Sequence, residues 1–129
     1  MKVFNTIHDF REWRKAISGS IGFVPTMGAL HKGHLSLVSK SNEMCQFTVV
    51  SIFLNPAQFS AGEDLETYPK NLKKDLDSLS IFKVEAVFIP LDLEMYPIDY
   101  STYVSEKKIS SKLEGKSRPQ FFIGVLTVV

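Results

Sequence analysis

The sequence has few of the features that would tie it to an oxidising compartment, a membrane or nucleic acid. Cys45 is its single cysteine, so no disulfide can form within the chain. The most apolar run, 47–54, is far shorter than the roughly 20 residues of a membrane helix. Charged residues crowd the first 15 positions, and the formal net charge is only +1. We therefore expect a cytoplasmic protein with no membrane or nucleic-acid partner.

The length and the apolar periodicity predict one α/β domain. The chain has 129 residues, of which 44% are hydrophobic, enough for one core. The patterns predict three strands, over 21–25, 47–54 and 85–89. They also predict three helices: one that opens at Thr6 and stops before Gly19, one after Gly28, and one over 70–80. The second helix would turn Leu35, Leu37 and Val38 inward, and the third would have Leu72, Leu76 and Leu79 on one side. This alternation predicts a doubly wound parallel sheet, Rossmann-like, whose ligand site lies beyond the carboxyl ends of the strands.

The segment from Met27 to His34 runs from a predicted strand end into a predicted helix start. A helix start presents unpaired backbone N–H groups and the positive end of the helix dipole, which together favour phosphate. Gly28 allows a tight turn, and Gly33 keeps the first helical turn uncrowded for a ligand. His31 lies three residues before His34, so both can donate hydrogen bonds from one face. The pattern predicts a polyphosphate cradle.

The common nucleotide-binding motifs are missing from the sequence, and a metal site is poorly supported. The sequence has no G-x-x-x-x-G-K-[ST] motif and no G-x-G-x-x-G after a strand. The tripeptide 115–117 reads Gly-Lys-Ser, but Ser110 stands where a P-loop requires its first glycine. A metal site at His31 and His34 lacks a visible third ligand. Two histidines that merely cap a helix remain an alternative for this short pattern.

Longer blocks of sequence resemble a known family. His-x-Gly-His at 31–34 is similar to the HIGH motif of the nucleotidylyl-transferase superfamily. The blocks 25–34, 50–59, 63–69, 94–97 and 113–119 resemble, in order, those of the pantothenate synthetase (pantoate–β-alanine ligase) family. The resemblance covers essentially the whole chain. It implies a ligase of pantothenate biosynthesis, on the route to coenzyme A.

That resemblance also implies a reaction and the roles of several residues. Pantoate would attack ATP, accompanied by Mg²⁺, to give pantoyl adenylate and pyrophosphate, and β-alanine would then displace AMP. The ATP site would be lined by Met27, Gly28, Ala29, Leu30, His31, Lys32, Gly33 and His34. His34 would be the catalytic proton donor, and Gln58 would bind both pantoate and β-alanine. Asn55 either shapes this pocket or is only a turn residue before Pro56. The family resemblance further implies a homodimer through this half.

Two departures from the family pattern bear on these expectations. Gln120 and Phe121 stand where the family has Gly-His. The chain ends at Val129, before two further blocks that complete the ATP site in the family. We therefore expect an amino-terminal nucleotide-binding domain, residues 1–129, that is inactive alone and self-associates through an exposed, β-prone tail over 125–129. Another nucleotidylyl transferase, or a non-catalytic nucleotide-binding or dimerising module, remains as an alternative.

Overall fold

The structure is a computed structural model that describes residues 1–59, 65 and 68–129. The polar stretch 62–64, for which the sequence predicts a loop, and most of the family block at 63–69 lie outside the described residues. Along the chain the elements are β1 (Lys2–Phe4), α1 (Ile7–Lys15), β2 (Ile21–Thr26), α2 (Lys32–Met44), β3 (Phe47–Ile52), the 3₁₀ turn η1 (Pro56–Gln58), α3 (Leu72–Ser80), β4 (Ala86–Phe88), α4 (Asp92–Met95), α5 (Glu114–Ser117) and α6 (Phe121–Val128).

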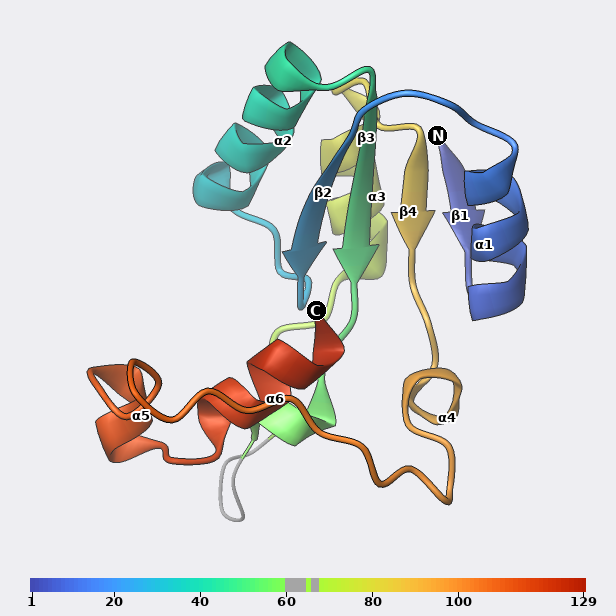
Figure 1. Cartoon of the computed structure of the whole chain (residues 1–129). Coiled ribbons are helices and arrows are strands. Elements are labelled where there is room, and N and C mark those ends of the chain that lie inside the picture. Colours follow the sequence, from blue (N-terminus) through green and yellow to red (C-terminus); the bar gives the residue numbers. More distant parts are fainter. Residues whose placement is uncertain (60–64, 66–67) are drawn as a thin grey trace.

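The centre of the molecule is a four-stranded sheet with the strand order β1-β4-β3-β2, in which all paired strands are parallel. β3 is buried along nearly its whole length, as a nearly continuous β-branched run predicts. Because the strands are parallel, their carboxyl ends meet at one edge of the sheet. Figure 1 shows α6 lying across that edge, below the ends of β2 and β3.

Helices cover both faces of the sheet, which confirms the predicted doubly wound arrangement. Val87 of β4 lies in the main core with Val38 of α2 and Leu79 of α3. The next residue, Phe88, stacks on Phe10 of α1 with ring centroids 5.0 Å apart. Successive strand residues point to opposite faces, so α1 covers one face while α2 and α3 cover the other.

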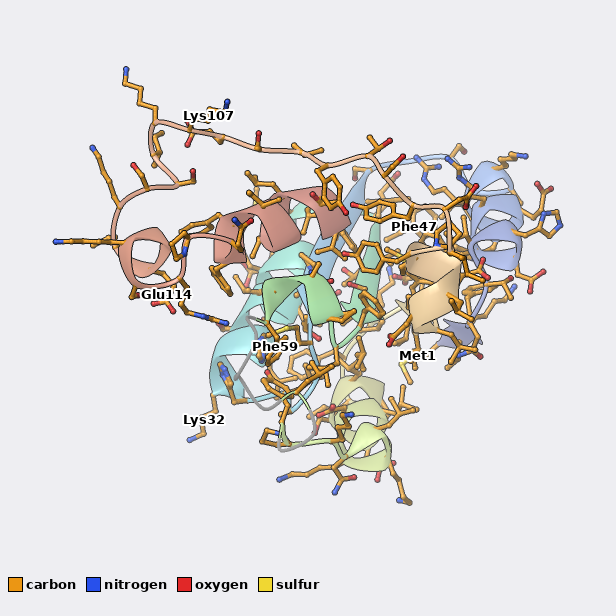
Figure 2. All side chains as sticks on the ribbon, turned by 90° about the horizontal axis from the view of Figure 1, so that it is seen from below. Met1, Lys32, Phe47, Phe59, Lys107 and Glu114 are labelled. Carbon is orange, nitrogen blue, oxygen red and sulfur yellow. The ribbon has the colours of Figure 1, made fainter. Side chains whose placement is uncertain are left out.

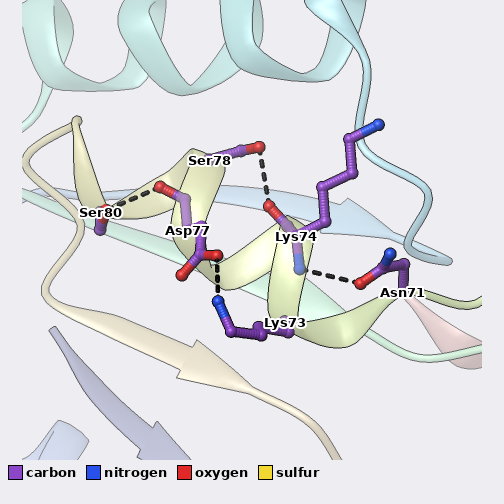
Figure 3. Close-up of polar contacts among 6 residues, drawn as sticks. All are labelled: Asn71, Lys73, Lys74, Asp77, Ser78 and Ser80. Carbon is purple, nitrogen blue, oxygen red and sulfur yellow. Dashed lines mark hydrogen bonds and ion pairs between the residues drawn. The ribbon is translucent and has the colours of Figure 1, made fainter.

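Helix α3 separates its polar and buried sides cleanly. Asn71 caps its start by accepting from the Lys74 N–H, and Lys73 pairs with Asp77 on the exposed side (Figure 3). On the inner side Leu79 is fully buried and Asp75 is only 3% exposed. A buried carboxylate in the first turns of a helix requires partners, and these lie in the candidate site.

Several sequence-based expectations were wrong in detail. Leu37 is 56% exposed, because it lies off the α2 face that buries Val38. Leu72 is 44% exposed, and Asp75 takes the buried position instead. The tail over 125–129 is not a β-prone edge, because most of it belongs to α6.

The short elements near the ends of the chain were not predicted. These are β1, α5 and α6. The Gly-Lys-Ser tripeptide lies within α5, where Gly115 is buried, and not after a strand as a P-loop would. In the part of the chain that the structure describes, every helix is too short or too polar to cross a membrane.

Candidate active site

A cavity of about 290 Å³ opens at the carboxyl ends of β2 and β3. Met27, His34 and Gln58 all line it, so the structure brings together predicted residues from both loops. Figure 2 views this edge of the molecule and shows Phe59 near its middle, with Lys32 at the periphery and its side chain directed outward. Of the predicted ATP-binding segment, Met27 and His34 therefore line the cavity, and the side chain of Lys32 points away.

The loop between β2 and α2 is held by a carboxylate that the sequence analysis missed. Gly28 adopts a φ of 87°, which confirms the predicted tight turn. The two residues after it donate backbone N–H bonds to Asp75, from Ala29 to Oδ2 at 3.0 Å and from Leu30 to Oδ1 at 2.8 Å. Ala29 itself has a φ of 51°, a conformation that costs energy for a residue with a side chain. Asp75 thus stabilises a strained loop by two charge-assisted hydrogen bonds.

The two histidines cap the start of α2. His31 is the N-cap residue, and its Nδ1 accepts from the Gly33 N–H at 3.1 Å. His34 Nδ1 accepts from the His31 N–H at 3.4 Å, and the two rings lie 4.1 Å apart. The rings therefore share one face, as their spacing predicts. Since Nδ1 is an acceptor in both, a neutral ring carries its proton on Nε2, which makes Nε2–H the donor.

The backbone of this helix start differs from the predicted cradle of unpaired N–H groups. N–H donors that already have a partner within the protein belong to Gly28, Ala29, Leu30, His31 and Gly33. The space beside Gly33 is taken by the His31 ring, since an added Cβ would lie 2.8 Å from His31 Cε1. These five amides are therefore engaged within the protein, whereas the imidazole Nε2–H groups can donate to a ligand.

Burial sets the protonation of His34. Partial burial lowers the pKa of His34 below its ordinary value, the neighbouring His31 lowers it further, and the Asp75 carboxylate opposes the shift. The neutral imidazole is therefore the favoured form near neutral pH. His34 can donate a hydrogen bond to a phosphate while adding no positive charge.

The second loop is organised around Asn55, which is only 1% exposed. Its Oδ1 accepts from the Ala57 N–H at 3.2 Å, and its Nδ2 donates to the Gly124 carbonyl at 3.0 Å. A backbone N–H can only donate and a carbonyl can only accept, so these two bonds fix the orientation of the Asn55 amide. Asn55 Nδ2 also donates to Gln58 Oε1 at 2.8 Å. Because the oxygen of the Gln58 amide is bonded to Asn55, the NH₂ group is the part that can bond to a ligand in the cavity. Asn55 is both the turn residue and the support of Gln58.

Arg118, directly after α5, holds the same loop and packs on Phe121, the first residue of α6. Arg118 donates from Nη2 to the Gln58 carbonyl at 2.8 Å. Its guanidinium lies over the Phe121 ring, 4.3 Å from the centroid. The phenylalanine that replaces the family's histidine therefore packs against Arg118. Gln120, the other departure, lines a separate cavity of about 360 Å³ beside Tyr96 and Tyr100.

Asp75 and Tyr96, whose hydroxyl donates to Asn55, are site residues that the sequence analysis missed. A signal existed for Asp75, because a charged residue stands on the predicted apolar side of its helix. Tyr96 stands in the family block 94–97, but its role was not predicted, since only the fold brings it beside Asn55, 41 positions away. Among the residues that the structure describes, no group of three or more His, Cys, Asp or Glu side chains could hold a metal ion.

A parallel α/β sheet with a paired-histidine helix start at its carboxyl edge defines the chain as a Rossmann-like protein of the HIGH-motif type. The family model for pantoate-beta-alanine ligase matches residues 2–129. The chain therefore belongs to the pantoate-beta-alanine ligase family.

Individual relatives agree with this assignment. The pantothenate synthetase of Pseudothermotoga lettingae is 56% identical over 92% of this chain, and the pantoate–β-alanine ligase of Saccharomyces cerevisiae is 45% identical over all of it. A solved structure of the Francisella tularensis ligase, complexed with beta-gamma ATP and beta-alanine, superimposes with a TM-score of 0.93 at 41% identity over 99% of this chain. These matches cover 42%, 46% and 50% of the relatives, so the chain spans about half of their length.

Replacement of Asp75 by Asn should destabilise the fold. The Asn amide has one oxygen, so its NH₂ group would face the N–H of Ala29 or Leu30, and a buried donor would lose its partner. A loss of roughly 1–3 kcal/mol in the free energy of unfolding is expected, measured by urea denaturation. The matched control is Asp77→Asn on the exposed side of α3, which should leave the unfolding midpoint almost unchanged. Equal effects of the two variants would refute the role given to Asp75.

Protonation of His34 should follow the lowered pKa. The His34 ring signals in an NMR titration should have a midpoint below 6.5, and His31→Gln should raise that midpoint, because the neighbouring His31 lowers the pKa of His34. Since the unfolded chain binds this proton more tightly, the contribution of His34 to stability is complete above pH 6.5 and is lost as the pH falls through the folded pKa. A midpoint above 6.5 would contradict the neutral-donor role.

Proposed function

We propose that this chain supplies the nucleotide- and acid-binding half of an enzyme that joins pantoate to β-alanine at the expense of ATP. The observation that carries the proposal is that Met27, His34 and Gln58 line one cavity at the carboxyl edge of the sheet. Family membership and the Francisella tularensis ligase complexed with beta-gamma ATP and beta-alanine support it. ATP would bind along residues 27–34 as its Mg²⁺ complex.

In the first step the pantoate carboxylate attacks the α-phosphorus of ATP. A new P–O bond forms, and the bond to the pyrophosphate oxygen breaks, giving pantoyl adenylate and pyrophosphate. His34 Nε2–H donates to a phosphate oxygen whose negative charge grows in the transition state. Because the His34 pKa is lowered, we assign it the role of a neutral hydrogen-bond donor, and the reaction needs no net proton from it.

Gln58 would orient the acid and then serve the second step. Its NH₂ group donates to the carboxylate or hydroxyl oxygens of pantoate, which aligns the nucleophile with phosphorus. In the second step the β-alanine nitrogen attacks the acyl carbon, AMP leaves with the electron pair, and the nitrogen loses a proton. The Gln58 Oε1 has a second lone pair beside the one bonded by Asn55, and this can accept from the incoming amine.

The assembly and location of the enzyme belong to the same proposal. We propose a homodimer, supported by the family resemblance and by exposed apolar side chains near α5, where Ile109 is 72% and Leu113 is 90% exposed. We also propose a cytoplasmic location, because the ATP that the reaction consumes is an intracellular nucleotide.

Loss of His34 or of Gln58 should impair different steps. The test uses an enzyme in which residues 1–129 precede the carboxyl-terminal half of the Pseudothermotoga lettingae relative. His34→Ala should slow adenylate formation by roughly 10²–10³-fold at saturating substrates, because its donor acts on charge that develops in the transition state. Gln58→Ala should raise the pantoate KM while ATP binding stays nearly intact, since its amide contacts the acid. Rapid-quench detection of pantoyl adenylate across a pantoate titration measures both effects.

The control for these variants is His8→Ala, which removes an exposed histidine from α1, away from the cavity. Its rates should equal those of the parent enzyme. Adenylate formation at the parent rate in His34→Ala would exclude the phosphate role of His34. A parent enzyme that binds ATP but makes no pantothenate would exclude the proposed ligase activity.

Self-association should depend on the exposed apolar side chains near α5. Sedimentation velocity should show a concentration-dependent dimer for the parent chain, because burying Leu113 and Ile109 against a second copy removes apolar area from water. Leu113→Lys should shift the population towards monomer. The opposite finding, a monomer at every concentration, would remove the support for a homodimer.

A further inference from the structure

Tyr96 lies directly after α4, far from Gln58 in sequence, yet its hydroxyl donates to Asn55 Oδ1 at 2.7 Å. This is the shortest of the hydrogen bonds that Asn55 makes with Tyr96, Gln58, Gly124 and Ala57. Because the Ala57 N–H fixes Oδ1 as an acceptor, Tyr96 must be the donor in this pair. Burial raises the pKa of the Tyr96 hydroxyl, so it keeps its proton through the neutral range.

Aromatic neighbours hold the Tyr96 ring in place. Phe53, just after β3, lies 6.1 Å away between ring centroids, and Tyr100 packs edge-on at 4.9 Å. These contacts restrict the ring and leave the hydroxyl directed at Asn55. A phenylalanine at position 96 would keep both packing contacts and lose only the hydrogen bond.

We propose that Tyr96 is a positioning residue that acts on the substrate pocket through Asn55. Its hydroxyl restrains the Asn55 amide, and Asn55 Nδ2 in turn holds Gln58 Oε1. As a result, the NH₂ group of Gln58 faces the cavity and can donate a hydrogen bond to an oxygen atom of a bound hydroxy acid. This last consequence rests on the proposed function, while the restraint itself depends only on the hydrogen-bonded chain.

The test compares Tyr96→Phe with Tyr103→Phe. Tyr103 belongs to the same aromatic group and packs edge-on against Tyr100, but it is 61% exposed, and the hydroxyl that donates to Asn55 is that of Tyr96. In the 129-residue chain, hydrogen exchange of the Asn55 side-chain NH₂ is measured by NMR, together with the Gln58 NH₂ signals. Tyr96→Phe should speed the Asn55 exchange by about tenfold and shift the Gln58 signals. Tyr103→Phe should change neither.

Two exchange results would overturn the assignment. One is equal behaviour of the two variants. The other is an equal acceleration at the backbone N–H groups of Val49 and Val50 in β3, since that would show a general loss of stability.

Titration with pantoate separates this inference from the proposed function. In the parent chain the Gln58 NH₂ signals should move on addition of pantoate, and Tyr96→Phe should raise the dissociation constant by about three- to tenfold, the effect of one neutral hydrogen bond. Unmoved Gln58 signals in the parent chain would count against the proposed function, while the exchange result would still decide the restraint. Equal pantoate affinity in the parent and in Tyr96→Phe would overturn the positioning role.

Discussion

The buried amide of Asn55 is the interaction on which the loop that carries Gln58 depends. Its hydrogen bonds reach Gln58 in η1, Gly124 in α6 and Tyr96 after α4, so it connects three segments that are separate elements of the fold. Asn55 is only 1% exposed, so water cannot replace a missing partner, and each bond constrains the others. Gly124 makes the arrangement possible, because a Cβ there would lie 2.2 Å from the Ala57 carbonyl oxygen. The close contact between the backbones of Gly124 and Ala57 and the hydrogen bonds of the Asn55 amide therefore act together to fix the position of Gln58. In the loop between β2 and α2, Asp75 has the same function, because it holds a strained loop by its backbone N–H groups.

Much of the fold could be predicted because its longest elements carry strong local signals. The Thr6 side chain caps α1 by accepting from the Asp9 N–H, as expected for a helix that opens at Thr6. The buried β-branched run of β3 and the apolar spacing of α3 also gave nearly correct positions. Strand β1 has three residues, too few to show a period. Helix α6 is rich in phenylalanine and valine, which favour strands, and its packing on η1 overrides that preference.

The candidate site also combines features that the local sequence predicts with contacts that it does not predict. The pairing of His31 with His34 and the tight turn at Gly28 follow from local spacing, so the sequence predicts them. The use of Nδ1 as an acceptor in both histidines does not follow, because it depends on the direction in which each ring turns. The bonds of Asp75 to Ala29 and Leu30 span 46 and 45 positions, and no local pattern encodes them. The local geometry of the two loops was thus easier to predict than the distant residues that hold it.

The strand order has a consequence for how the chain folds. β1 begins at Lys2, yet it is an edge strand whose neighbour is β4. Asn5, just after β1, donates to the Ile89 carbonyl, 84 positions later. Closing so long a loop is entropically costly, and contacts of this sequence separation slow folding. During synthesis β1 leaves the ribosome well before β4, so it must wait for the intervening chain before it finds its partner. Once β4 has joined the sheet, and until β1 pairs with it, the edge of β4 is open to strands of other molecules.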